Sequence, residues 1–222
     1  MGGRGSRVTD NRRFASKTMN AAAVPVAAAG FAMKVHSKPA GIPEHAQMKH
    51  THYIRQSYLF CMYRNYVLDI KKYLTGRRVL EVGPNKGHLF EKYYPQTKSY
   101  TLVEPNQHFE KYYVKLQKRH PNLHYKISGF ETYTSDEKFD TIVMMAVISH
   151  IRMDSKDIVD KIDSMLNPDG YLIVETNNSK RNLQVFDLCD KKYEKIEVKA
   201  SYDGIMRRLK IDYRDVLIYR KV

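Results

Sequence analysis

A short stretch at residues 79–87 constrains the fold more than any other part of this chain. Its sequence is Val-Leu-Glu-Val-Gly-Pro-Asn-Lys-Gly, an apolar run that breaks into a loop with two glycines four residues apart, and residues 88–93 then resemble the start of a helix. Gly83 can adopt a positive φ, Asn85 is one of the few other residues that tolerate it, and Gly87 lets the helix approach closely. A strand, a glycine loop and a helix in this order predict an α/β protein that brings its backbone close to a nucleotide-like ligand.

The rest of the chain alternates between strand-like and helix-like segments. A helix, or two in sequence, is expected within residues 44–74, because apolar residues recur there at helical spacing before Thr75 and Gly76. Strands are expected at 78–82, 99–103, 124–127, 141–147, 171–175, 195–199 and 216–220, and helices after Asn106, from Asp154 and, as a short one, near 182–188, with a turn at 167–170. This alternation predicts a doubly wound, mostly parallel seven-stranded sheet with helices on both faces. The last two strands have no long crossover between them, which predicts that the last strand is antiparallel.

The chain is strongly basic. Its 222 residues include 38 Lys and Arg against 24 Asp and Glu, a formal net charge of +14. The first 43 residues hold seven of the basic residues and one acid, Asp10, so the remainder carries 31 basic and 23 acidic residues, or +8. Such a charge favours a polyanionic partner such as RNA, DNA or an anionic membrane surface, or it serves solubility alone.

Apolar runs, cysteines and histidines bear on the compartment and on metals. No apolar run approaches the roughly 20 residues that a membrane span requires, so no transmembrane segment is expected. Cys61 and Cys189 are far apart and match no metal or redox spacing, which favours a reducing, cytoplasmic location. His45, His50 and His52 lie close together without the Cys or carboxylate spacing that completes a metal site, so no metal is expected.

Residues 1–43 are predicted to form a basic, flexible tail, since Gly, Arg and Ser open the chain and residues 20–30 are mostly Ala and Val. Three functional interpretations compete with an ordinary linker. The Arg-rich, Ala-rich and acid-poor composition is typical of a mitochondrial transit peptide. Residues 1–6 match the N-myristoylation pattern, and the nearby arginines would supply the second signal for peripheral membrane contact. In the third interpretation the arginines contact nucleic acid directly.

The glycine spacing separates two classes of site. A dinucleotide loop has the pattern G-x-G-x-x-G, whereas the glycine-like residues here are Gly83, Asn85 and Gly87. This pattern resembles motif I of the class I S-adenosylmethionine (SAM)-dependent methyltransferases, E/D-x-G-x-G-x-G, with Asn85 in place of the middle glycine. An NAD-dependent oxidoreductase is correspondingly disfavoured. The resemblance extends over residues 74–222 and is specific at two further places, residues 102–105 and residues 139–143 continuing into 166–174.

The resemblance implies a SAM cofactor, with S-adenosylhomocysteine (SAH) as its product. Glu104 lies 17 residues after Gly87, where a carboxylate would hold the ribose hydroxyls. The loop at 128–131 would close on the adenine, although Ser128 and Gly129 depart from the acidic and small pair of many relatives. The residues expected to contact the cofactor are Glu81, Gly83, Pro84, Asn85, Gly87, Glu104, Pro105, Asn106, Gly129, Phe130, Glu131 and Ala146.

Residues 145–151 are expected to leave the fourth strand toward the transferred methyl group. His150 matches a histidine common in the family at this point, where it would contact the substrate and act as general base; the competing interpretation is a packing histidine. Tyr58, on the preceding helix, is expected to cap the pocket and contact the substrate. The chain is thereby divided into the tail at 1–43, an N-terminal helical lid at 44–76 and a Rossmann-like methyltransferase domain at 77–222.

These features predict a SAM-dependent methyltransferase that transfers a methyl group to an O, N or S nucleophile. A small-molecule acceptor is favoured, because no appended RNA- or protein-binding segment is recognisable. RNA is the close alternative, with a phosphate-contacting face formed by Arg207, Arg208, Lys210 and Arg214. A third interpretation is a non-catalytic binding or scaffold protein with a methyltransferase fold, which the departures in the glycine loop and the adenine loop would permit.

Overall fold

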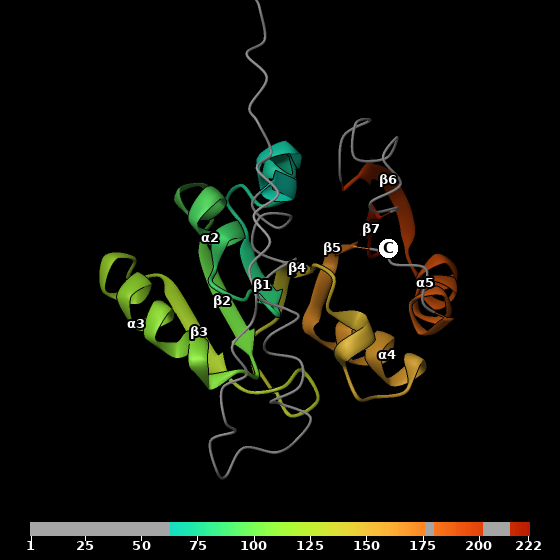
Figure 1. Ribbon diagram of the computed structural model, residues 1–222. Coiled ribbons are helices and arrows are strands. Elements are labelled where there is room, and N and C mark those ends of the chain that lie inside the picture. The colour runs from blue at the N-terminus through green and yellow to red at the C-terminus, as the bar shows by residue number, and fades with distance from the viewer. Residues whose placement is uncertain (1–62, 176–179, 202–213) are drawn as a thin grey trace, which may run out of the picture. The chain divides into compact units, whose positions relative to one another are not determined.

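The computed structural model describes residues 63–175, 180–201 and 214–222 (Figure 1). All of them lie in the second of two compact units, Met1–Gly41 and Ile42–Val222. Three predicted features lie outside the described residues, and what was predicted for them stays a prediction: the tail at 1–43, the part of the 44–76 lid that precedes residue 63, with Tyr58, and the basic residues at 207–210.

Seven strands form one sheet in the order β3-β2-β1-β4-β5-β7-β6. Strands β1 to β5 pair in parallel, and β7 lies antiparallel between β5 and β6, so the predicted antiparallel last strand is confirmed. Because β1 lies between β2 and β4, the strand order reverses there, which creates the point where open α/β sheets bind ligands. The strand bounds are β1 Arg78–Val82, β2 Ser99–Glu104, β3 Leu123–Ile127, β4 Phe139–Met144, β5 Leu166–Glu175, β6 Glu194–Ala200 and β7 Asp215–Arg220.

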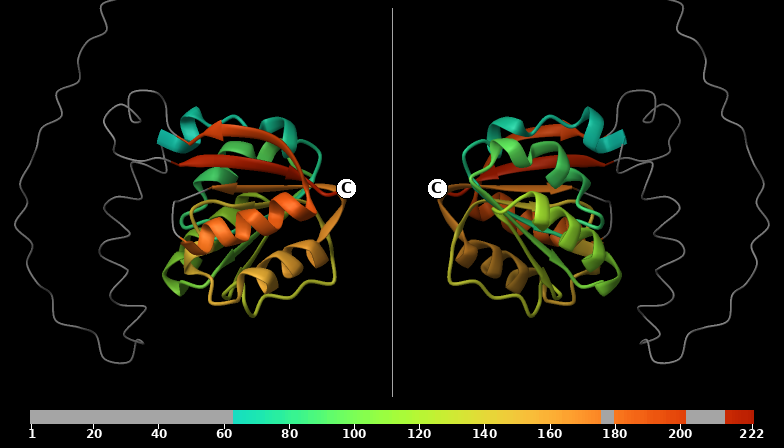
Figure 2. Two further views of the ribbon diagram at one scale, coloured as in Figure 1. Left: turned by 90° about the vertical axis from the view of Figure 1, so that its right-hand side faces the viewer. Right: turned by 90° about the vertical axis from the view of Figure 1, so that its left-hand side faces the viewer.

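Helices cover both faces of the sheet, as predicted (Figures 1 and 2). On one face, Leu102 and Val143 pack with α2 and α3 in one buried cluster. On the other, Ile142 and Leu172 pack with α4 and α5 in a second cluster. Successive strand residues point to opposite faces, so each central strand is apolar on both sides. The helix bounds are α2 His88–Tyr93, α3 Glu110–Arg119, α4 Ser155–Met165 and α5 Lys180–Lys192, with 3-10 turns η1 Lys71–Tyr73, η2 Tyr94–Gln96, η3 Gln107–Phe109 and η4 Ile148–His150.

Strand β4 differs from its prediction at both ends. It begins two residues earlier than expected and ends at Met144 rather than Val147. Ala146 has a φ of +56°, which takes the chain out of the sheet. Met145 is nevertheless 6% exposed and belongs to the buried cluster on the α2 face. The apolar sequence therefore continues past the end of the strand.

The predicted turn at 167–170 lies inside β5, which the prediction began only at Tyr171. Phe139 pairs with Leu166 and Thr141 pairs with Tyr171, so four residues of β5 lie opposite Asp140 alone. Asp169 has a φ of +58°, as a turn residue does, but strand pairing exists on both sides of it. The turn residues therefore form a wide bulge. Helix α5 is also longer than the short helix predicted near 182–188, and the buried Cys189 extends its apolar side past the predicted end.

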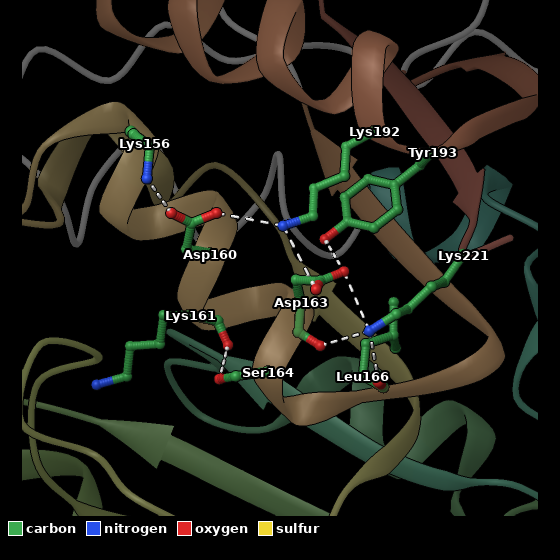
Figure 3. Close-up of polar contacts among 9 residues, drawn as sticks. All are labelled: Lys156, Asp160, Lys161, Asp163, Ser164, Leu166, Lys192, Tyr193 and Lys221. Carbon is green, nitrogen blue, oxygen red and sulfur yellow. Dashed lines mark hydrogen bonds and ion pairs between the residues drawn. The ribbon is translucent and has the colours of Figure 1, made fainter.

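An ion-pair cluster joins α4, α5 and the last strand (Figure 3). The Asp163 carboxylate lies 3.3 Å from Nζ of Lys192 and 3.0 Å from Nζ of Lys221. Tyr193 donates its hydroxyl hydrogen to the same carboxylate at 3.3 Å. These contacts fasten the two helices of one face to each other and to the end of the chain.

The described part of the N-terminal segment is fastened to α2. Residues 63–67 are helical, but the helix does not continue toward Leu74 as predicted, since residues 68–70 are irregular and the 3-10 turn η1 follows them. Lys92 donates from Nζ to the carbonyl oxygens of Asn65, Tyr66 and Leu68, and such cationic capping of the last carbonyls stabilises a helix end. The Tyr93 hydroxyl donates to the same Leu68 carbonyl at 2.6 Å. This segment therefore has a defined place on the α2 face of the sheet.

Candidate functional site

The glycine loop after β1 places three alternating residues in the left-handed region. The φ angles are +70° at Gly83, +56° at Asn85 and +81° at Gly87, so the predicted tolerance of Asn85 for this geometry is confirmed. A Cβ at Gly83 would lie 2.8 Å from Cγ2 of Val147. The turn after β4 therefore packs against the loop at the point where β1 ends, and it leaves no room for a side chain at Gly83.

Glu104, the last residue of β2, is tied to this loop. It is 7% exposed, and its carboxylate accepts hydrogen bonds from the backbone N–H of Asn85 at 3.2 Å and of Asn106 at 3.0 Å. Burial raises the pKa of Glu104 to about 7, although these two bonds favour the ionised form. An ionised carboxylate has about four lone-pair sites, so two remain for hydroxyl donors.

Glu81 is buried within β1, where it points toward the α2 face. The Tyr100 hydroxyl donates to its Oε2 at 2.8 Å. Burial raises the pKa of Glu81 to about 7, against the lowering effects of the Tyr100 hydrogen bond and of the Arg64 charge. A group of this kind takes up or releases a proton near neutral pH according to the charge of a neighbouring ligand.

The loop after β3 begins beside Glu104, because the Ser128 N–H donates to the Glu104 carbonyl at 3.1 Å. Phe130 is 2% exposed and belongs to the core on the α4 face, with Lys161 Nζ 5.3 Å from its ring centroid. The Glu131 carboxylate accepts from the Arg152 N–H at 2.5 Å. Both side chains expected at the adenine thus have contacts within the protein, and their contact with a cofactor stays a prediction.

A polar group that the sequence reasoning missed lies in the same loop. The Ser128 hydroxyl is buried and has no hydrogen-bond partner within the described ranges. Gly129 is next to it, and a Cβ there would meet Oε2 of Glu131 at 2.3 Å. In the sequence, Ser128 stands where many relatives have an acidic residue. The resemblance alone implied a lost adenine contact and did not indicate that the serine hydroxyl could replace that contact.

The other residues predicted for the site differ in their exposure to solvent. Pro84 is buried, Asn106 is partly buried and accepts from the His108 N–H at 3.0 Å, and Pro105 is exposed. Ala146 lies in the turn that reaches the glycine loop through Val147. His150 ends η4 and is exposed, about one turn farther along the chain.

A buried ion pair at the end of β5 had no counterpart in the sequence prediction. Arg64 Nη1 lies 2.7 Å from Oε2 of Glu175, and the two side chains are 7% and 0% exposed. Arg214 Nη1 is 3.9 Å from the same oxygen. The sequence does contain a pattern that could have pointed to Glu175. Strands β2 and β5 both end an apolar run in a glutamate, and β1 carries a glutamate in its next-to-last position.

Two further observations concern metal binding and membrane spans. Among the residues at 63–175, 180–201 and 214–222, no group of three or more His, Cys, Asp or Glu is placed to hold a metal ion. Within the same residues, no helix has the length and apolar character needed to span a membrane.

Known proteins resemble this chain in sequence and in fold. The ubiquinone biosynthesis O-methyltransferase of Bradyrhizobium diazoefficiens is 29% identical over 117 residues, which are 52% of this chain and 45% of that protein, so the chain matches about half of that relative's length. The N-methyltransferase NodS from Bradyrhizobium japonicum WM9, solved in complex with SAH, has a TM-score of 0.57 at 15% identity and covers 81% of this chain and 91% of its own. The Burkholderia thailandensis 1,6-didemethyltoxoflavin-N1-methyltransferase, solved with its acceptor and SAH, has a TM-score of 0.58 at 15% identity and covers 84% and 93%.

The structural likenesses concern the fold, which is the Rossmann-like methyltransferase fold predicted from the sequence. The family is shown by a separate observation, because the family profile described as a methyltransferase domain matches residues 51–206 of the 222. The chain therefore belongs to the methyltransferase domain family, among the class I SAM-dependent methyltransferases.

Proposed function

We propose that this protein is a SAM-dependent methyltransferase that transfers a methyl group to an O, N or S nucleophile of a small molecule. The observation that carries the proposal is the position of Glu104, a buried carboxylate held against a loop with three left-handed residues. That arrangement offers acceptors for two adjacent hydroxyls beside a glycine loop at the carboxyl end of β1, which suits a nucleoside.

The residues of the site fit SAM. At Gly83, a Cβ would collide with the Val147 side chain, so the close packing of the turn after β4 against the glycine loop depends on glycine. The Ser128 hydroxyl, buried without a partner in the described residues, is next to the strand end that carries Glu104 and suits a polar edge of adenine. Bound SAM supplies an electrophilic methyl group on a sulfonium.

Each residue then has a role of its own. Glu104 accepts the ribose hydroxyls, and Glu81 with the loop from Gly83 to Gly87 faces the methionine part. Pro105 and Asn106 flank the adenine, with Ser128 at its polar edge. Ala146 lies where the β4 turn meets the glycine loop. The chain contributes mainly by alignment, which alone lowers the barrier of a two-reactant step considerably.

His150 is proposed as the general base for acceptors that lose a proton. It is exposed at the end of η4, within the segment that follows β4. A His150→Ala variant should lower kcat at pH 6 to 8 and flatten its pH dependence, with SAH affinity unchanged. A variant that keeps both the rate and the pH profile would assign His150 to packing.

The acceptor is proposed to be a small molecule. The printed descriptions of the matched proteins support this, since one acts in ubiquinone biosynthesis and another was solved with 1,6-didemethyltoxoflavin. The net charge of +14 favours RNA as the second candidate. Tyr58 is proposed as an acceptor contact from the N-terminal lid.

The test is methyl transfer from SAM labelled in its methyl group. The purified protein is incubated with cell extract, and the RNA, protein and small-molecule fractions are counted separately. Label in the small-molecule fraction, absent with a Glu104→Ala variant, supports the proposal. Label confined to RNA would replace the proposed acceptor by the second candidate, and no SAH binding by the wild type would favour a scaffold protein.

A further inference from the structure

One oxygen of Glu175 is unsatisfied although the residue is fully buried. Glu175 has 0% exposure, and its Oε2 receives the 2.7 Å hydrogen bond from Arg64. Its other oxygen, Oε1, is buried without a hydrogen-bond partner among the residues that the structure describes. A buried polar atom without a partner is costly and uncommon in folded proteins, and ligand binding is one of the reasons for which such an atom is retained.

The position of Glu175 places this oxygen at the ligand-binding edge of the sheet. Glu175 is the last residue of β5, and parallel sheets bind ligands at the carboxyl ends of their strands. Strand β5 is separated from β1 by β4 alone, so its end lies on the order of 10 Å from the end of β1. That separation suits a second small ligand beside one held by the glycine loop.

The strand register also fixes the face. Glu81 is aligned with Val143, which is aligned with Ile173, and these residues share one face of the sheet. Glu175 lies two residues beyond Ile173, so its side chain points to the same face as Glu81. Glu175 is therefore on the side of the proposed cofactor site that faces the N-terminal segment.

Arg64 holds the carboxylate in one orientation. Its Nε donates to the Asn65 side-chain oxygen at 3.2 Å while Nη1 is bonded to Oε2 of Glu175. The fastening of residues 65–68 by Lys92 and Tyr93 limits the movement of this arginine. The Arg64 charge also offsets that of Glu175, so the pair favours a neutral hydrogen-bond donor over an ammonium ion.

We propose that Glu175 recognises the methyl acceptor, with Oε1 accepting a hydrogen bond from a neutral O–H or N–H group while Arg64 positions the carboxylate. The proposal rests on the proposed function and narrows its substrate class to small molecules that carry such a donor near the reacting atom. It also makes Arg64 a positioning residue, because it acts on the acceptor through Glu175.

The test uses three monosubstituted benzenes that differ in the polar group they carry, anisole being one methyl group larger than phenol. Phenol carries an O–H donor, aniline carries an N–H donor, and anisole carries an ether oxygen and no donor. Binding of each probe to the full-length protein saturated with SAH is measured by ligand-detected NMR titration. Wild-type protein should bind phenol and aniline at least about tenfold more tightly than anisole, the discrimination expected of a hydrogen bond to a charged group.

A Glu175→Gln variant should remove this preference. Arg64 then donates to the amide oxygen, which leaves the amide N–H₂ where Oε1 was, a donor in place of an acceptor. Phenol and aniline should bind about tenfold more weakly than to the wild type, so that neither is preferred over anisole by the wild-type margin. Glu137→Gln is the matched control, since Glu137 is an exposed carboxylate in the loop before β4, and it should leave all three affinities unchanged.

Two outcomes would overturn the inference. One is a wild-type protein that binds SAH but shows no preference for the donor probes, a result that does not depend on any variant folding. The other is a folded Glu175→Gln variant, judged by its circular dichroism, that keeps the wild-type order. SAH titration of the same samples separates the two proposals, because absent SAH binding would overturn the proposed function and with it this inference.

Discussion

The Glu104 carboxylate accepts a hydrogen bond from the backbone N–H of Asn85 at 3.2 Å, which joins the end of β2 to the middle of the glycine loop. The same carboxylate accepts from the Asn106 N–H at 3.0 Å. Glu104 therefore organises both sides of the proposed ribose site before any ligand arrives, although Asn85 lies 19 residues before it in the sequence.

Replacing Glu104 by alanine should abolish most cofactor affinity. The variant loses the proposed hydrogen bonds to two ribose hydroxyls, and bonds to a charged group contribute about 1.5–3 kcal/mol each. SAH affinity measured by calorimetry should fall at least about 100-fold. A thermal shift at a SAH concentration that adds ~2.7 kcal/mol to the wild type, about 100 times Kd, should vanish in the variant. An unchanged shift would remove Glu104 from the site.

Gly83 and Gly76 provide a matched pair for the glycine loop. Both have a φ of +70°, but a Cβ at Gly83 would lie 2.8 Å from Val147 while a Cβ at Gly76 would meet nothing within 4 Å. Gly76→Ala should cost only the left-handed strain of about 1–2 kcal/mol. Gly83→Ala should cost about 1–3 kcal/mol more by urea unfolding, because the clash is added. Val147→Ala should recover part of that difference, and equal costs at the two glycines would contradict the contact.

Glu104 should make stability fall with rising pH. Burial raises its pKa in the folded protein from the ordinary value of 4.5 to about 7. The folded state therefore binds more protons than the unfolded state between these values, so this contribution is fully present below pH 4.5 and is lost as pH rises through 7.

The Glu104→Gln variant isolates this effect, since other groups titrate in the same range. The free energy of unfolding of the wild type, relative to the variant, should fall by on the order of 3 kcal/mol between pH 4 and pH 8. Urea unfolding at four or five pH values measures it. Parallel pH profiles for the two proteins would show that Glu104 is ionised across the range.

The ion pairs of α4 should differ in their contribution to stability. Asp163 is 28% exposed and contacts Lys192, Lys221 and Tyr193, whereas Asp160 is 48% exposed with Lys156 and Lys192 as partners. Burial works to raise the pKa of Asp163, but the bonds and charges of Lys221 and Lys192 lower it overall.

Asp163→Asn should therefore destabilise the protein by about 1 kcal/mol, while Asp160→Asn should change little. Urea unfolding in 0.05 M and 0.5 M NaCl measures both, and the Asp163 effect should persist better in salt because its pairs are less exposed. A larger effect at Asp160 than at Asp163 would contradict this prediction. It would mean that the more exposed ion pairs of Asp160 hold α4 against α5.

Much of the architecture was predictable because its signals are local. A left-handed φ is a property of single residues, so Gly83, Asn85 and Gly87 were identified from the sequence and confirmed. Strand β1 was predicted at its observed bounds, because apolar runs between turn residues are readable one segment at a time. The absence of a long crossover before the last strand predicted that this strand is antiparallel, and the structure confirms it.

The tertiary structure alone decided which distant residues meet. Arg64 and Glu175 are separated by 111 residues, and no periodicity in either segment indicates that they pair. Phe130 packs in the core cluster that includes residues of α4, which its place in a loop did not indicate. Val147 lies in the turn after β4, where its side chain packs against Gly83. The predicted turn at 167–170 forms a bulge within β5. Local sequence thus determined the elements and the glycine loop, whereas the burial of shared faces determined which polar groups were enclosed together and which oxygen was left without a partner.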